Sequence, residues 1–157
     1  MDKFRFPFRE RKHRLDAEIY RGEYIISFTL CIKDKEEFFT NHKIFKTFED
    51  ILLGELNAFD CSAYVYLFMP NHVHILLSGN NPKVDIKKCL ESFKQKTGFW
   101  LYEHKKEIKW QKDYYDHILR SEDNLIVYTK YILNNPVRAS LVIIGKNICL
   151  KVRLFTI

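Results

Sequence analysis

Two histidines lie two positions apart in the segment HVHILLS, residues 72–78. If this segment is a β-strand, His72 and His74 project from the same face of the sheet, because successive side chains of a strand alternate between its faces. Neutral imidazole is a common ligand of divalent metal ions, so the pair can supply half of a metal site. Two histidines at this spacing also occur as a polar strand face or a hydrogen-bonded pair, and the spacing alone leaves these alternatives open.

A second polar pair follows about 60 residues further along the chain, where Tyr131 and Asn135 share a face at the end of a helix. A phenol is a nucleophile that can form a covalent phosphodiester, but with a pKa of about 10 it needs help to ionise. A bound metal would polarise the phosphate under attack, and the Asn135 amide oxygen could complete its coordination. Alternatively, Tyr131 packs at the edge of a core and Asn135, before Pro136, caps a following helical turn.

The elements that position these residues follow from the hydrophobic pattern. Alternating or β-branched and aromatic side chains predict four strands, at residues 24–33, 61–69, 72–78 and 113–119. Apolar residues at helical spacing predict three helices, at residues 41–59 and 83–102 and from a Ser121 cap to near Pro136. The first of these helices has Thr40 or Asn41 as its capping residue.

The order β-α-β-β-α-β-α predicts an α+β fold: a ferredoxin-like βαββαβ antiparallel sheet with an added C-terminal helix that carries the tyrosine. In that topology the first and third strands are central, so residues 72–78 lie in mid-sheet. We expect one domain over residues 1–157, with a basic N-terminal arm at about 1–20 and a core at about 21–142.

The chain of 157 residues has 26 Lys and Arg against 20 Asp and Glu, a formal net charge of +6. The excess lies in two segments, with +4 in residues 1–14 and +5 in residues 83–112. Basic segments of this kind favour a polyanion such as nucleic acid, although a solvated helix face with a basic tail has the same charges. The basic candidates for DNA contacts are Arg11, Lys12, Arg14, Lys94, Lys96 and Arg138.

Composition also bears on the compartment. The four cysteines, at positions 31, 61, 89 and 149, form no CxxC pair, so we expect four reduced thiols rather than a zinc or redox motif. The sequence has no apolar run of about 20 residues and no secretory signal at its charged start. We therefore expect a soluble cytoplasmic protein without a membrane partner.

Two motifs make a family resemblance visible. MPNHVHILL at 69–77 together with YILNNPVRASLV at 131–142 resembles the HUH single-tyrosine transposases, in particular the REP-associated tyrosine transposases. WQKDYYDHILRS at 110–121 and RKHRLDAEIYRGEYIISFTLCI at 11–32 fit the same pattern, so that the resemblance extends over about residues 9–142. It implies the ferredoxin-like fold, with an active site made from the histidine pair and a helical tyrosine.

By this resemblance His72 and His74 bind a divalent metal, Mg²⁺ or Mn²⁺, with Asn135 as a further metal ligand and Tyr131 as the nucleophile. The implied activity is transposition, in which single-stranded DNA at hairpin elements is cleaved and rejoined through a 5′-phosphotyrosine. Members include dimers and monomers, so a homodimer is one expectation. The alternative is a ferredoxin-like module that binds nucleic acid without cleaving it.

Two further residues compete for roles at this site. Tyr128 lies one turn before Tyr131, but the family pattern places the nucleophile directly before Ile-x-x-Asn-Pro, which selects Tyr131; core packing is then the role of Tyr128. His117, in the fourth predicted strand, is either a structural histidine or a residue that supports the metal ligands or contacts DNA.

Overall fold

The computed structural model describes residues 16–120 and 122–134, and within them the predicted order of strands and helices is confirmed. The strands and α-helices follow each other as β1 (Ile25–Cys31), α1 (His42–Ala58), β2 (Cys61–Met69), β3 (His72–Gly79), α2 (Ile86–His104), β4 (Tyr115–Leu119) and α3 (Glu122–Leu133). Two short 3-10 helices that the hydrophobic pattern does not predict are η1 (Ala17–Tyr20) and η2 (Lys33–Lys35).

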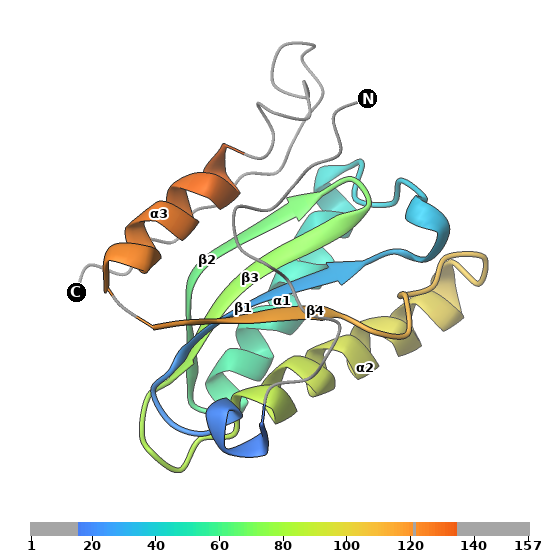
Figure 1. The fold of residues 1–157 in the computed structure, drawn as a ribbon. Coiled ribbons are helices and arrows are strands. Elements are labelled where there is room, and N and C mark those ends of the chain that lie inside the picture. The colour runs from blue at the N-terminus through green and yellow to red at the C-terminus, as the bar shows by residue number, and fades with distance from the viewer. Residues whose placement is uncertain (1–15, 121, 135–157) are drawn as a thin grey trace.

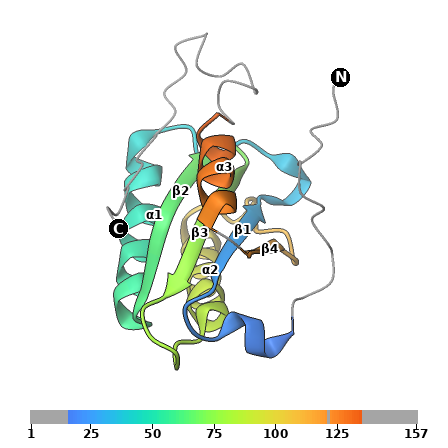
Figure 2. The same cartoon turned by 60° about the vertical axis from the view of Figure 1, so that its left-hand side comes forward.

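The four strands form one antiparallel sheet in the order β2-β3-β1-β4, so β1 and β3 are central as the ferredoxin-like topology requires. Helices α1 and α2 lie together on one face of the sheet and α3 lies on the other (Figures 1 and 2). The fold is therefore ferredoxin-like with an added C-terminal helix, as predicted.

Each of the two long helices begins at a side chain that accepts a hydrogen bond from its first turn. Asn41 Oδ1 accepts from the backbone N–H of Ile44 at 2.9 Å, which decides between the two capping candidates for α1. Asp85 Oδ1 accepts from the N–H of Lys88 at 3.1 Å and starts α2.

The sheet has apolar clusters on both faces. The larger cluster lies between the sheet and the pair α1 and α2, and it includes Phe28, Phe48, Ile75 and Phe93. A smaller cluster lies under α3 and includes Leu67, Met69, Leu76, Tyr128 and Tyr131. Because burial of apolar surface drives folding, the larger cluster supplies most of the stability, and α3 covers the second face with fewer contacts.

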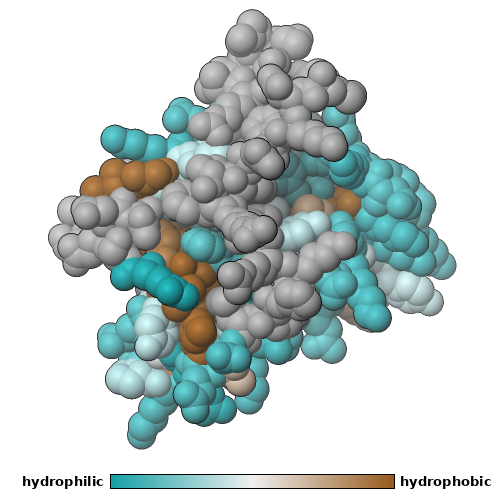
Figure 3. Space-filling model, viewed as in Figure 1, coloured by the Kyte–Doolittle hydropathy of each residue, from teal (hydrophilic) through white to brown (hydrophobic). Residues whose placement is uncertain are grey.

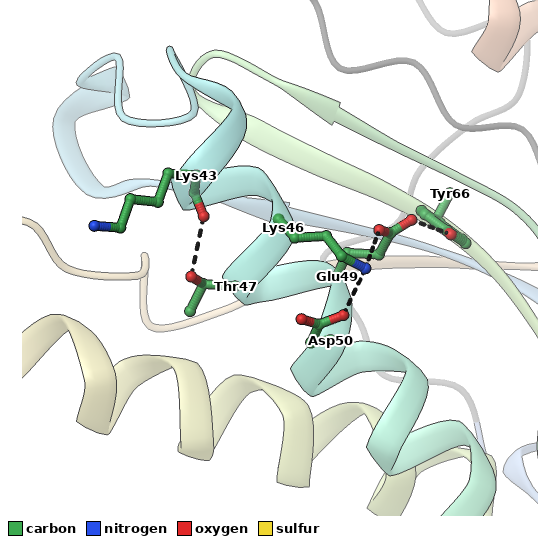
Figure 4. Close-up of polar contacts among 6 residues, drawn as sticks. All are labelled: Lys43, Lys46, Thr47, Glu49, Asp50 and Tyr66. Atoms are coloured by element: carbon green, nitrogen blue, oxygen red, sulfur yellow. Dashed lines mark hydrogen bonds and ion pairs between the residues drawn. The ribbon is translucent and has the colours of Figure 1, made fainter.

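A buried carboxylate ties α1 to β2 (Figure 4). Glu49 is buried, and its Oε1 accepts a hydrogen bond from the Tyr66 hydroxyl at 2.6 Å. The Lys46 ammonium lies 3.3 Å from Glu49 Oε2 and 2.7 Å from Asp50 Oδ1. Hydrogen bonds of this kind offset the cost of removing the carboxylate from water.

The described helices include none that is long and apolar enough to cross a bilayer. No disulfide joins any two of Cys31, Cys61 and Cys89, and Cys149 lies outside the described residues. The fourth strand begins at Tyr115, two residues later than predicted. The residues before it belong to a loop, because Trp110 forms an isolated β-bridge with Ile32 and the N–H of Gln111 donates to Cys31 O.

Candidate functional site

Strand β3 presents both histidines on the sheet face that α3 covers. His72 is paired with Cys31 on β1 and Met69 on β2, and His74 is paired with Thr29 and Leu67. The alternate residues of the strand, Val73, Ile75 and Leu77, belong to the larger cluster on the opposite face. The alternation predicted for this segment is therefore confirmed.

The two imidazoles converge. Nε2 of His72 and Nε2 of His74 are 3.1 Å apart, and the rings meet edge to face with centroids 4.8 Å apart. The second nitrogen of each ring has its own partner: His72 Nδ1 lies 2.6 Å from Asn71 Oδ1, and His74 Nδ1 lies 2.9 Å from Thr29 Oγ1. With these second nitrogens held, the two Nε2 atoms lie within hydrogen-bond distance of each other.

Burial keeps both rings in the neutral form. It lowers the pKa of His72 from 6.5 to about 4. The pKa of His74, which is only 1% exposed, falls well below 6.5 because of burial and then because of the charge that His72 would carry. Neutral rings retain the lone pairs that a metal ion needs.

The donor set fits a divalent cation. Two ligands that lie about 2.1 Å from one ion at a right angle are about 3.0 Å apart, close to the observed separation of the Nε2 atoms. When imidazole binds a metal, its other N–H usually donates to an oxygen, which is the role open to Asn71 Oδ1 and Thr29 Oγ1. The described residues contain no group of three or more His, Cys, Asp or Glu side chains that could hold a metal.

The helical tyrosine lies on the same face of the sheet as the histidine pair. Tyr131 belongs to the cluster that includes Leu67 and Met69, which are the β2 partners of His74 and His72. Its side chain is 4% exposed in this arrangement. In Figure 1, α3 runs in the general direction of β2, toward the end of the sheet where β2 turns into β3.

Tyr128 and His117 lie further along this face. Tyr128 is buried in the same cluster, which confirms its packing role, and its ring stacks on His117 with centroids 5.9 Å apart. The pKa of His117 is lowered by burial and by the neighbouring Arg120, against an opposing effect of Asp116. These contacts support a structural role for His117.

Several predicted site residues lie elsewhere. Lys94 and Lys96 are on α2, which packs on the face of the sheet opposite the histidines. Lys94 Nζ donates to the carbonyl oxygen of Lys112 at 2.5 Å, and Lys96 forms an ion pair with Glu55. The predicted residues Arg11, Lys12, Arg14, Asn135 and Arg138 lie outside the described residues.

Sequence reasoning missed the two residues that hold the histidine rings. A signal existed for each: Thr29 is on the polar side of the alternating first strand, and Asn71 directly precedes His72. Neither signal identifies a histidine partner without the pairing of β1 with β3, which brings Thr29 opposite His74.

The chain is similar in sequence to known proteins. The family model described as IS200-like transposase matches residues 21–135. A Haemophilus influenzae protein described only as uncharacterized is 25% identical over 167 residues, covering 81% of this chain and 88% of that protein.

Two solved structures share the fold. A REP-associated tyrosine transposase bound to a REP hairpin aligns with a TM-score of 0.66 and 16% identity, over 90% of this chain and 76% of that one. A candidate transposase from Deinococcus radiodurans aligns with a TM-score of 0.52 and 16% identity, over 85% of this chain and 97% of that one.

Proposed function

Since the chain belongs to the family of IS200-like transposases, we propose that it cleaves and rejoins single-stranded DNA at hairpin elements through a 5′-phosphotyrosine. The observation that carries the proposal is the convergence of the two Nε2 atoms on the sheet face against which Tyr131 packs. Hairpin DNA as the substrate is supported by the related transposase, which was solved bound to a REP hairpin.

In this proposal His72 and His74 hold a divalent metal ion through their Nε2 atoms, with Asn135 as a third ligand. The ion, when bound, polarises the scissile phosphate and offsets the charge that develops in the transition state. Mn²⁺ and Mg²⁺ are both candidates; because Mg²⁺ is a hard cation that prefers oxygen ligands, a pair of nitrogen ligands favours Mn²⁺.

Tyr131 acts as the nucleophile. Its oxygen attacks the phosphorus and its proton departs to water. The bond from phosphorus to the 3′ oxygen breaks and that oxygen takes a proton from water, so that a 5′-phosphotyrosine and a free 3′-hydroxyl form. A second 3′-hydroxyl later attacks the phosphotyrosine and restores the tyrosine. Because Tyr131 is only 4% exposed, DNA reaches its hydroxyl only after α3 shifts on the sheet. The small cluster under α3 makes such a shift less costly than one of α1 or α2.

The proposal is tested by trapping the covalent intermediate. Labelled hairpin oligonucleotides with single-stranded flanks are incubated with the full chain and Mn²⁺ or Mg²⁺, and denaturing electrophoresis then detects a protein–DNA adduct. We expect the adduct with wild type and with Tyr128→Phe, the matched control one helical turn away, and its loss in Tyr131→Phe and with EDTA. An adduct that persists in Tyr131→Phe would exclude this nucleophile.

The same experiment addresses the alternative of a module that only binds nucleic acid. Such a protein would retard the hairpin in a native gel and form no metal-dependent adduct with any oligonucleotide tested. A homodimer stays a prediction, which size-exclusion chromatography with light scattering would test.

A further inference from the structure

A hollow of about 560 Å³ lies between the second half of α2 and the loop that leads from α2 to β4, away from the histidine pair. Its lining includes Lys94, Tyr102, Lys106, Lys109, Trp110 and Lys112. We call this surface the α2–loop groove. Its volume falls within the range of about 300–1,000 Å³ that is usual for ligand pockets.

The α2–loop groove is strongly basic. Its lining includes four lysines and one glutamate, a formal charge of +3 in a chain whose total is +6. Within the described part of the chain, Lys106, Lys109 and Lys112 are exposed and form no ion pair. Figure 3 shows a mainly hydrophilic surface on the right-hand side of the molecule, where the end of α2 lies in the matching view of Figure 1. A ligand that matches this charge carries several negative groups.

The groove also offers an exposed aromatic ring. Tyr102 is 66% exposed, and Phe99, one turn earlier on α2, is 61% exposed. The other aromatic side chains of the lining are used by the fold: Trp110 donates to Thr97 Oγ1 at 2.9 Å, and Tyr114 is buried. Lys106 Nζ lies 5.8 Å from the centroid of the Tyr102 ring, so the ring and a cation are already side by side. A nucleobase has a flat face that can stack on an exposed ring of this kind.

Backbone pairing places the groove at the same end of the sheet as His72. The loop is bound to the end of β1, since Gln111 N–H donates to Cys31 O and Lys33 N–H donates to Lys109 O. Cys31 is in turn the β1 partner of His72. β1 lies between the loop and β3, which carries the histidines. Two strand spacings amount to roughly 10 Å, and this is the separation of the loop from β3 across the sheet.

We propose that the α2–loop groove binds single-stranded DNA, with a base stacked on Tyr102 and phosphates on Lys106, Lys109 and Lys112. The role of the groove in holding the unpaired strand beside the cleaved phosphate depends on the proposed function. The affinity of the groove for single-stranded DNA does not. Nucleic acid fits better than an acidic peptide because the lining combines exposed lysines with the exposed ring of Tyr102, and a peptide carboxylate uses only the lysines.

The binding test uses a fluorescein-labelled oligothymidylate, which forms no hairpin, and measures fluorescence anisotropy with the full chain in EDTA. Tyr102→Ala should weaken binding at least about fivefold, the lower end of the effect of losing one stacked base. The triple variant Lys106→Ala/Lys109→Ala/Lys112→Ala should reduce the slope of log affinity against log salt by about 2, since each phosphate contact contributes about 0.7 for a single strand.

Matched variants control for charge and for aromatic area. Tyr24→Ala removes a tyrosine that is 53% exposed and lies outside the groove, and it should bind like wild type. The triple variant Lys43→Ala/Lys83→Ala/Lys88→Ala removes the same charge from exposed lysines outside the groove and should change the slope by less than half as much. Equal losses in groove and control variants would overturn the proposal, because binding would then follow net charge alone.

Two other ligands distinguish single-stranded DNA from the alternative occupants of the groove. Oligouridylate that binds several times more tightly than oligothymidylate would reassign the groove to RNA, and polyglutamate binding that survives in Tyr102→Ala and exceeds that of the oligonucleotide would reassign it to an acidic protein. The covalent adduct assay is run on the same samples. Weak oligothymidylate binding together with a normal Tyr131 adduct would refute the proposal for the groove and leave the proposed function standing. Groove binding without any adduct would refute the proposed function and leave the groove proposal standing.

Discussion

Acidification of the metal-free protein should remove stability that depends on the neutral histidine pair. Burial lowers the pKa of His72 from 6.5 to about 4, so the native state resists a proton that the unfolded chain accepts. The contribution of the neutral His72 ring to the free energy of unfolding is therefore fully present above pH 6.5. It is lost as the pH falls and is gone below about pH 4. At about 1.4 kcal/mol for each pH unit, His72 accounts for up to about 3 kcal/mol.

The comparison that isolates this effect is wild type against His72→Gln, by urea unfolding in EDTA at several pH values between 7 and 4. Carboxylates that titrate near pH 4 are common to both proteins and cancel in the difference. Between pH 7 and pH 4, we expect the free energy of unfolding of His72→Gln to fall by up to about 3 kcal/mol less than that of wild type. Because domains are stable by about 5–15 kcal/mol, such a difference is easily measured.

A matched control is His42→Gln, since His42 is exposed and lies outside the candidate site. We expect it to follow the wild-type dependence on pH. If His72→Gln and wild type lost stability in parallel, burial would not keep the His72 ring neutral, and the basis for treating the pair as ready ligands would fail. A wild-type protein that gained stability relative to His72→Gln on acidification would contradict the sign of the pKa change.

Two further substitutions test contacts around the site and the core. Thr29→Val removes the hydroxyl beside His74 Nδ1 at nearly constant volume. The affinity for Mn²⁺, measured by calorimetry, should fall about 10- to 100-fold. An unchanged affinity would show that this contact does not orient the His74 ring. Tyr66→Phe removes a donor from the buried Glu49 carboxylate and should cost about 1–3 kcal/mol in urea unfolding, while the covalent adduct still forms because this contact lies on the other face of the sheet.

The strands and long helices were predictable from the sequence because each has at least one strongly apolar face. In α2, Ile86, Leu90, Phe93 and Leu101 recur at helical spacing and are all buried in the larger cluster. The same principle predicted that His72 and His74 share a sheet face, since the period of a strand does not depend on what covers it.

Features that depend on packing between distant segments were not predictable. Ser27 and Thr29 lie on the polar side of the alternating pattern of β1, yet both are buried. Helix η2 contains Asp34 and Lys35 at positive φ, 58° and 57°, a conformation that the sequence KDK does not indicate. The groove beside α2 forms only because the loop before β4 is bound to β1, a contact between segments about 80 residues apart in the chain.

The division of the sheet into two faces explains why stability and chemistry can be tested separately. One face is filled by α1, α2 and the larger cluster, so its side chains are fixed by close packing. The other face holds the histidine pair and, among the described residues, the small cluster under α3, where polar rings and the phenol of Tyr131 can lie near each other. Substitutions such as Tyr131→Phe should therefore alter the covalent reaction more than the free energy of unfolding, whereas Tyr66→Phe should do the reverse. A loss of adduct in Tyr131→Phe accompanied by a large loss of stability would mean that α3, rather than the phenol oxygen, had been disrupted.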